Sequence, residues 1–226
     1  PWNLDQIELS CYRNTYYWVA YQLFETPEYP EYGMSASPLK FLEPRKSLFD
    51  PLRNADLCIP VTKMGKTIFE NHNVNSTDNI YLGIDYDSRC VDDKVTKESL
   101  FGSKYKDDFI FMTVGKNSER KKLDKIIESF ALFMSKSRKQ GKYKLYIHTD
   151  PNESVTGTDL ISLASNLGII DHILWPSTIL NRTIMTDSGL YKRYKVCDTY
   201  ISLSGGEGLC YPLIEAMMHN KPVIYL

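Results

Sequence analysis

The sequence predicts an α/β protein built on a parallel β-sheet. From about residue 108 onward, apolar runs of strand length alternate with segments of helical periodicity, an order typical of parallel sheets. Three of the predicted strands lead directly into polar or glycine-containing loops, which begin at Gly115, at His148 and at Ser204. Because ligands of parallel sheets bind at the carboxyl ends of the strands, these three loops are the candidate ligand-binding segments.

The first 107 residues predict a smaller and more irregular part of the fold. Proline, glycine and aromatic residues predict a loop at 26–33, and the polar run 87–107, which has few apolar residues, predicts a linker. Strands are expected at 16–21 and 55–61, a short helix at about 63–70, and a further extended segment at 79–85. The chain is therefore expected to divide into residues 1–90 and residues 91–226.

The second part predicts a regular alternation of strands and helices. Leu123, Ile126, Ile127, Phe130 and Met134 recur at helical spacing, which predicts an amphipathic helix over about 121–138. The remaining helices are expected from Thr158 or Asp159 to Gly168, at 187–194, and from Pro212 onward. Strands are expected at 108–114, 143–147, 172–175, 199–203 and 221–226.

The composition is that of an ordinary globular protein. The 226 residues are 42% hydrophobic and 24% charged, and the net charge of -1 argues against a dedicated nucleic-acid binder. Basic residues cluster at 116–125 and at 136–144. A solvated helix end is the favoured interpretation of the second cluster, and contact with an acidic membrane surface is the alternative. No run approaches the roughly 18 apolar residues that cross a bilayer.

The five cysteines predict neither a disulfide framework nor a zinc site, because their number is odd and no pair has the C-x-x-C spacing. A reducing compartment and a cytoplasmic location fit best. The four histidines also lack metal-ligand spacing, so no metal site is expected. His148 ends a predicted strand, and a role in the ligand cleft and a structural role remain equally open.

A cation-rich loop follows the strand 108–114. Gly115 leads into Lys116, Arg120 and Lys121 just where the next helix is expected to open. Cations at a strand end beside a helix N-terminus would neutralise a diphosphate. The alternative is the charged start of a surface helix.

Two glutamates flank a glycine-rich turn after the strand 199–203. Glu207 and Glu215 are separated by seven residues that include Gly208 and Pro212. A carboxylate is a bidentate acceptor that suits a vicinal diol such as that of ribose, and a helix N-terminus suits a phosphate. A sugar joined to a nucleoside diphosphate offers both groups. Taken singly, Glu207 could be a loop acid and Glu215 a helix-dipole or capping residue.

The segment Ser204–Glu215 resembles the E-x7-E signature of retaining glycosyltransferases of the GT-B fold, of the family 4 type. Residues 216–224 resemble that family's continuation, and Gly115–Phe130 resembles its G-[RK]-x4-K loop and following helix. The resemblance covers about residues 55–226. It implies a Rossmann-like parallel sheet, with a truncated nucleotide-sugar-binding domain at 91–226 and a remnant of the N-terminal, acceptor-side domain at 1–90. An incomplete chain is therefore expected.

The resemblance also implies residue roles. Lys116 and Lys121 would hold the donor diphosphate, Glu207 would contact the transferred sugar as a catalytic residue, and Glu215 would bind the ribose hydroxyls. Further donor contacts are expected from the side chain of Arg120 and from the backbone N–H groups of Gly208, Leu209 and Cys210. The donor would be a UDP- or GDP-sugar, and neither a metal nor another cofactor would be needed. The acceptor would be a hydroxyl of a glycan, a lipid or a protein, and a lipid acceptor would bring peripheral membrane contact.

Two positions depart from the family pattern. Cys210 stands where the family commonly has a glycine, so the backbone there must avoid angles that only glycine adopts. Lys116 stands where arginine is frequent and supplies a point charge in place of a planar fork. Two alternatives stay open: a nucleotide-sugar isomerase (epimerase) of GT-B-like fold, and a nucleotide-sugar-binding domain without catalysis.

Overall fold

The computed structural model describes residues 17–23, 49–84, 94–137, 140–151, 157–176, 187–207 and 209–226. The chain forms two compact units. The first holds the residues up to Gly83 and the short segment Gly206–Leu209, and the second holds Ile84–Gly205 and Cys210–Leu226. The predicted domain boundary between residues 90 and 91 and the predicted loop at 26–33 fall outside the described residues.

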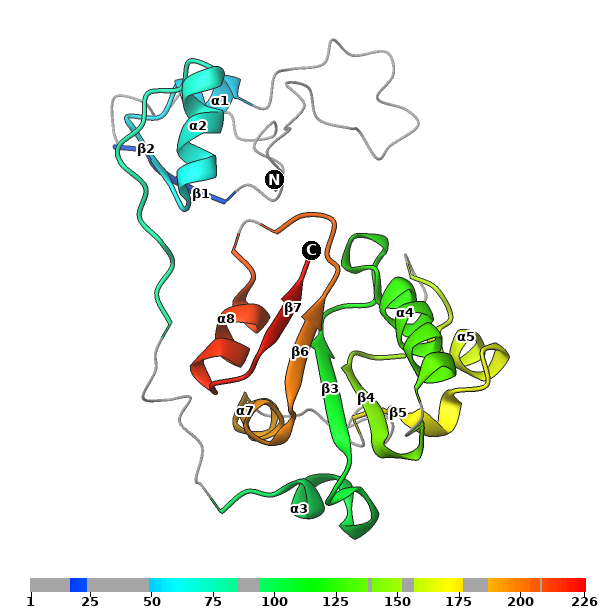
Figure 1. The fold of residues 1–226 in the computed structure, drawn as a ribbon. Coiled ribbons are helices and arrows are strands. Elements are labelled where there is room, and N and C mark those ends of the chain that lie inside the picture. Colours follow the sequence, from blue (N-terminus) through cyan, green and yellow to red (C-terminus); the bar gives the residue numbers. More distant parts are fainter. Residues whose placement is uncertain are drawn as a thin grey trace. The chain divides into compact units, whose positions relative to one another are not determined.

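The first unit pairs two parallel strands with two helices (Figure 1). Strand β1 (Val19–Gln22) runs beside β2 (Leu57–Pro60), and the helices are α1 (Asp50–Arg53) and α2 (Lys63–Asn71). Thr62 caps α2 by accepting the N–H of Gly65 at 3.1 Å. The unit has its own apolar core, made of Ala20, Phe49, Leu52, Cys58, Ile68, Phe69 and Val74.

The extended segment predicted at 79–85 forms no strand over its described residues 79–84. Its Ile80 N–H donates to the Pro60 carbonyl at 2.9 Å. One backbone bond does not make a ladder, because a strand needs a repeated set of such bonds to a neighbour.

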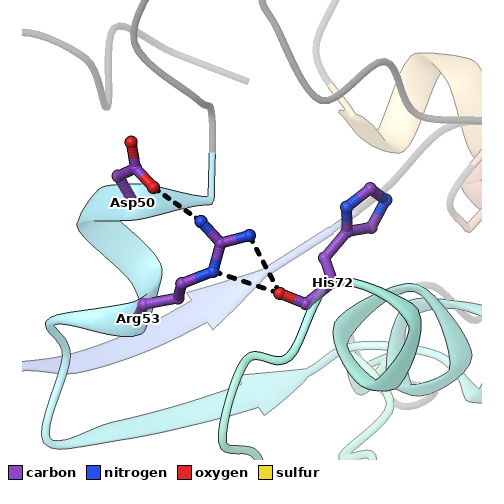
Figure 2. Close-up of polar contacts among 3 residues, drawn as sticks. All are labelled: Asp50, Arg53 and His72. Atoms are coloured by element: carbon purple, nitrogen blue, oxygen red, sulfur yellow. Dashed lines mark hydrogen bonds and ion pairs between the residues drawn. The ribbon is translucent and has the colours of Figure 1, made fainter.

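Arg53 joins the two helices of this unit (Figure 2). Its Nη1 donates to Asp50 Oδ1 at 2.6 Å, and its Nε and Nη2 donate to the His72 carbonyl at 3.1 and 3.0 Å. His72 directly follows α2, where carbonyl groups lack a helical partner, so the guanidinium caps that helix. The Phe49 ring stacks on the His72 imidazole with centroids 3.9 Å apart.

The second unit contains a five-stranded parallel sheet, as predicted. Its strands are β3 (Phe109–Val114), β4 (Tyr143–His148), β5 (Ile173–Leu174), β6 (Thr199–Ser202) and β7 (Val223–Tyr225). Their spatial order is β5-β4-β3-β6-β7, and every pair is parallel. The chain runs outward from β3 to β5 and then returns to the other side of β3 for β6. The strand order therefore reverses between β3 and β6, which is the point where ligands bind in open α/β sheets.

Helices cover both faces of this sheet (Figure 1). Helices α4 (Leu123–Lys136) and α5 (Leu160–Asn166) pack on one face, and α7 (Asp187–Val196) and α8 (Tyr211–Met218) pack on the other. Strand β4 shows the two-residue period of a strand. Its Leu145 and Ile147 belong to the core under α4 and α5, whereas Tyr146 belongs to the core under α7 and α8.

The predicted linker at 87–107 is wrong over its described part. Residues Lys97–Phe101 form helix α3, and Ser103–Tyr105 form a 3-10 turn. Thr96 and Ser99 form a capping box at the start of α3, and the Phe101 ring packs on Tyr146 with centroids 5.4 Å apart. A cap and one aromatic anchor thus stabilise a helix in a segment whose composition is mostly polar.

The helix predicted from residue 121 begins later, at Leu123. Residues Glu119–Lys121 form a 3-10 turn, and Lys122 takes the left-handed angles φ 50° and ψ 41° between that turn and α4. The other predicted start is confirmed, because the Asp159 carboxylate accepts the Ser162 N–H at 3.0 Å and α5 follows.

We expect Asp198→Ala to lower the free energy of unfolding by about 2–3 kcal/mol. One carboxylate oxygen of Asp198 accepts from Lys97 Nζ at 2.6 Å and from the Ile110 N–H at 2.7 Å, so it ties α3 to β3. Its removal leaves the Ile110 N–H without this acceptor, and it leaves the part-buried Lys97 ammonium without a counter-charge and with the Asp108 carbonyl at 2.7 Å as its remaining acceptor. Urea unfolding measures the change.

Glu128→Ala is the matched control, since it breaks the exposed pair that Lys125 makes with Glu128 at 2.9 Å. Exposed helix pairs contribute little to stability. Equal losses in the two variants would contradict the importance of the Asp198 contact.

Candidate functional site

The loops after β3 and β6 meet at the reversal point of the sheet. The Gly205 N–H donates to the carbonyl oxygen of Arg120 at 2.8 Å, and the Ser204 hydroxyl lies 3.4 Å from the same oxygen. These bonds connect two segments more than eighty residues apart in the chain. They fasten the predicted cation-rich loop to the start of the predicted glycine-rich turn.

The loop after β3 is also held from its other side. The Asn117 side chain is 3% exposed, and its Nδ2 donates to the Thr158 carbonyl at 2.8 Å. It packs so closely on Gly157 that a Cβ at that position would overlap the Asn117 carboxamide. At the start of the loop, the Gly115 N–H donates to the His148 carbonyl at 3.2 Å. Contacts with three neighbouring segments therefore fix the backbone of this loop.

The cationic side chains of the loop surround this fixed backbone. The Lys121 side chain runs along Gly115, with its Cδ 3.3 Å from the place where a Cβ would stand. Arg120 and Lys121 are half-buried in the 3-10 turn, and Lys116 is exposed. A side chain at position 115 would press on the lysine stem, which would have to shift by a few tenths of an ångström. The structure therefore brings Arg120 and Lys121 to the same loop junction as Ser204 and Gly205.

Glu215 lies on α8, the helix that follows the second loop. Pro212 occupies the first turn of α8, as predicted, and Cys210 is the residue before the helix. Cys210 is buried and has a φ of -79°, an angle that any residue adopts, so replacement of the family's glycine needs no unusual backbone. The Glu215 side chain is buried on the same helix at 8% exposure.

Tyr194 of α7 lies beside Glu215 and is a residue that the sequence did not single out. Its hydroxyl is buried without a hydrogen-bond partner among the described residues. Burial, and then the nearby Glu215 carboxylate, hold the pKa of Tyr194 well above its ordinary value. The phenol is therefore neutral at physiological pH and presents an O–H group next to the carboxylate.

The remaining predicted site residues lie in or next to the segment Gly206–Leu209. Glu207 and Leu209 are half-buried, and Gly208 falls outside the described residues. Their predicted donor contacts stay predictions.

His148 ends β4 next to the cationic loop and carries no charge at neutral pH. The Tyr146 hydroxyl lies 2.8 Å from His148 Nδ1. Burial first, and then the charge of Arg193, lower the pKa of His148 to about 4. Arg193 of α7 lies over the Tyr146 ring at 5.7 Å, which explains how its charge reaches the histidine. The charge of this side of the site therefore comes from the β3 loop and not from the imidazole.

Among the described residues, no cluster of three or more histidine, cysteine or acidic side chains is arranged to hold a metal ion. No described helix is both long enough and apolar enough to cross a membrane.

Comparison with known proteins relates the chain to one enzyme family. The model of the family described as "Glycosyl transferases group 1" matches residues 96–226. No match was found among curated proteins.

Solved structures share the fold at low sequence identity. Anabaena HepE in complex with UDP aligns with a TM-score of 0.64 and 16% identity over 92% of this chain and 52% of that one. Sucrose-phosphate synthase from Thermosynechococcus elongatus aligns with a TM-score of 0.60 and 18% identity, over 77% and 41%. The pneumococcal O-GlcNAc transferase GtfA, in complex with UDP and GlcNAc, aligns with a TM-score of 0.51 and 16% identity, over 79% and 32%. The chain thus spans about half or less of the length of these neighbours, and the likeness confirms the predicted α/β fold with its parallel sheet.

We expect Gly157→Ala to loosen the loop after β3. The added methyl group would displace Asn117 and break its bond to Thr158, so amide hydrogen exchange at residues 116–118 should become faster by about tenfold or more. Gly141→Ala is the matched control, because a Cβ at Gly141 meets no atom within 4 Å. Equal exchange rates in the two variants would show that Asn117 does not hold the loop.

His148 should make the folded state less stable in acid. The pKa of His148 in the folded state lies below the unfolded value of 6.5. As the pH falls from 6.5 to about 4, the unfolded chain therefore binds a proton that the folded chain does not bind. Stability is therefore lost across this window, by at most about 3 kcal/mol from this group. In His148→Gln, urea unfolding at pH 7 and pH 4.5 should show a smaller difference than in the parent protein. His172→Gln controls for loss of an imidazole elsewhere in the unit, in the 3-10 turn before β5, and an unchanged difference in His148→Gln would contradict the assignment.

Proposed function

The chain belongs to the group 1 glycosyl transferases, and we propose that it transfers a sugar from a nucleoside diphosphate sugar to a hydroxyl acceptor. One observation carries the proposal: the bond from the Gly205 N–H to the Arg120 carbonyl at 2.8 Å. It joins the cation-rich loop to the glycine-rich loop where the strand order reverses, which is the ligand position of such sheets. One neighbour of the same fold, Anabaena HepE, was solved with UDP, with UDP and glucose, and with UDP-glucose, which supports a UDP-sugar as donor.

Fixed cations would stabilise the departing diphosphate. Lys116 and Lys121 supply ammonium groups, and Arg120 supplies a planar fork that suits two phosphate oxygens. Because the loop that carries them is held by Asn117 and Gly205, the charges are in place before the reaction and need little rearrangement. In this proposal no metal is required. Transfer proceeds with retention, by attack on the face from which the diphosphate leaves.

The two glutamates would bind the hydroxyl-bearing parts of the donor. Glu207 contacts the transferred sugar, and Glu215 accepts hydrogen bonds from the ribose hydroxyls. The buried position of Glu215 beside the neutral Tyr194 supports this role, since a carboxylate shielded from water exchanges little hydration for a ligand contact. Backbone N–H groups of Gly208, Leu209 and Cys210 complete the donor contacts.

The thiols support a reducing compartment, such as the cytoplasm, as the place of action. Cys58, Cys197 and Cys210 are buried and form no disulfide. Burial raises the pKa of Cys58 to about 11 and also raises that of Cys197, so both remain protonated and unreactive. The proposed acceptor is a hydroxyl of a glycan, a lipid or a protein.

We expect Lys121→Ala and Glu207→Ala each to lower kcat by at least about a hundredfold, because each removes a group that acts on the reacting part of the donor. Transfer is measured with a panel of UDP- and GDP-sugars and hydroxyl acceptors. Lys125→Ala is the control: this exposed lysine lies in the first turn of α4, just after the cationic loop, and pairs with Glu128, so its loss should leave the rate unchanged.

The same assays separate the alternatives. Conversion of the donor without any acceptor would indicate an isomerase, and nucleotide binding without turnover would indicate a binding domain. Parent rates in both Lys121→Ala and Glu207→Ala would contradict the assignment of the site.

A further inference from the structure

Lys122 occupies a backbone conformation that lysine disfavours. Three non-glycine residues of the described ranges have positive φ angles: Asn73, Lys122 and Asn220, at 54°, 50° and 55°. Asparagine tolerates this region because its short side chain bonds to the local backbone, but lysine has no such compensation. Strain of this kind persists where the surrounding structure imposes it, and it is concentrated at functional sites.

The side chain of Lys122 reaches across the loop junction. Its Cε and Nζ lie 3.2 and 3.4 Å from the position that a Cβ would take on Gly205. Gly205 is exposed, and its N–H is already bonded to Arg120, so the ammonium lies over an open backbone at the end of β6. The left-handed turn at Lys122 thus brings a fourth cation of the β3 loop over the β6 loop.

The ammonium of Lys122 has no acidic partner in the described part of the chain. Two other lysines of the same unit have polar partners: Lys97 pairs with Asp198 at 2.6 Å, and Lys144 donates to the Asp171 carbonyl at 3.3 Å. The ion pairs of the described residues do not include Lys122. Lys122 is also the residue before α4, where the partial positive charge of a helix disfavours a cation. An anion bound here would supply the missing counter-charge and would interact favourably with the N-terminus of α4. Its binding would thereby offset the backbone strain at Lys122.

We propose that Lys122 is an additional phosphate-binding residue, which spans the β3 and β6 loops and contacts the diphosphate of the donor. The inference rests on the proposed function and deepens it. Lys122, together with Lys116, Arg120 and Lys121, gives the loop four cationic side chains. This number suits a diphosphate, whose negative charge is distributed over two phosphate groups, better than a single phosphate. Lys122 therefore favours a nucleoside diphosphate over the corresponding monophosphate.

Calorimetry on the full chain with UDP, GDP and UMP tests the proposal. Lys122→Gln should weaken binding of the preferred diphosphate by about tenfold, the value of one charge-assisted hydrogen bond, and should change UMP affinity less than threefold. Lys122→Arg should retain most of the affinity, because it keeps the charge. Lys122→Gly should weaken binding as much as Lys122→Gln without lowering Tm, since glycine accepts positive φ. If Lys122 had only a structural role, its replacement would lower Tm and leave the preference for the diphosphate unchanged.

Asn220→Gly is the matched control, because it makes the same backbone change at a φ of 55° without removing a charge. Its affinity for the diphosphate should equal that of the parent chain. If Lys121→Ala weakens binding and Lys122→Gln does not, the role of Lys122 is wrong and the proposed function survives. If the parent chain binds neither UDP nor GDP, both proposals fail.

Discussion

The hydrogen bond from the Gly205 N–H to the Arg120 carbonyl is the contact on which the proposed site depends. It is possible because the chain leaves β3, builds β4 and β5 on one side, and returns to place β6 on the other side. Two loops remote in sequence then leave neighbouring strands at the same edge of the sheet. A backbone bond and the Ser204 hydroxyl, 3.4 Å from the same carbonyl oxygen, hold these loops together.

Packing around this junction explains how several like charges can be held close together. Asn117 is buried against Gly157 and bonded to Thr158, and Gly115 leaves room for the Lys121 stem. These contacts fix the backbone, so mutual repulsion of the cations cannot simply spread the loop. The same junction includes the left-handed angle of Lys122 and positive charge at the start of α4. Elsewhere in the unit, charged groups such as Lys97 and Asp198 are paired in the ordinary way.

The sequence predicted what depends on local pattern and missed what depends on contacts between distant segments. Apolar periodicity located the strands and the body of α4, and the Asp159 cap located the start of α5. Helix α3 was not predicted, because a capping box and the Phe101 contact stabilise it in place of the apolar stripe by which helical periodicity is recognised. The contact of Asn117 with Gly157 and the position of Tyr194 beside Glu215 had no signal in the sequence, since each joins different elements. The late start of α4 follows from a single dihedral angle at Lys122, which neighbouring residue types do not reveal.

Burial keeps two titratable groups of the second unit neutral, those of His148 and Tyr194. Tyr194 belongs to α7, and His148 lies beside Tyr146 at the end of β4; loss of water lowers the pKa of the imidazole to about 4 and raises that of the phenol, so both are neutral near pH 7. Lys116 and its neighbours lie on a loop that solvent reaches, where charge costs less. A nucleoside diphosphate sugar has the same division, with a charged diphosphate between a neutral sugar and a neutral base. Charged groups on the β3 loop and neutral hydrogen-bonding groups deeper in the unit therefore suit the two chemistries of one ligand.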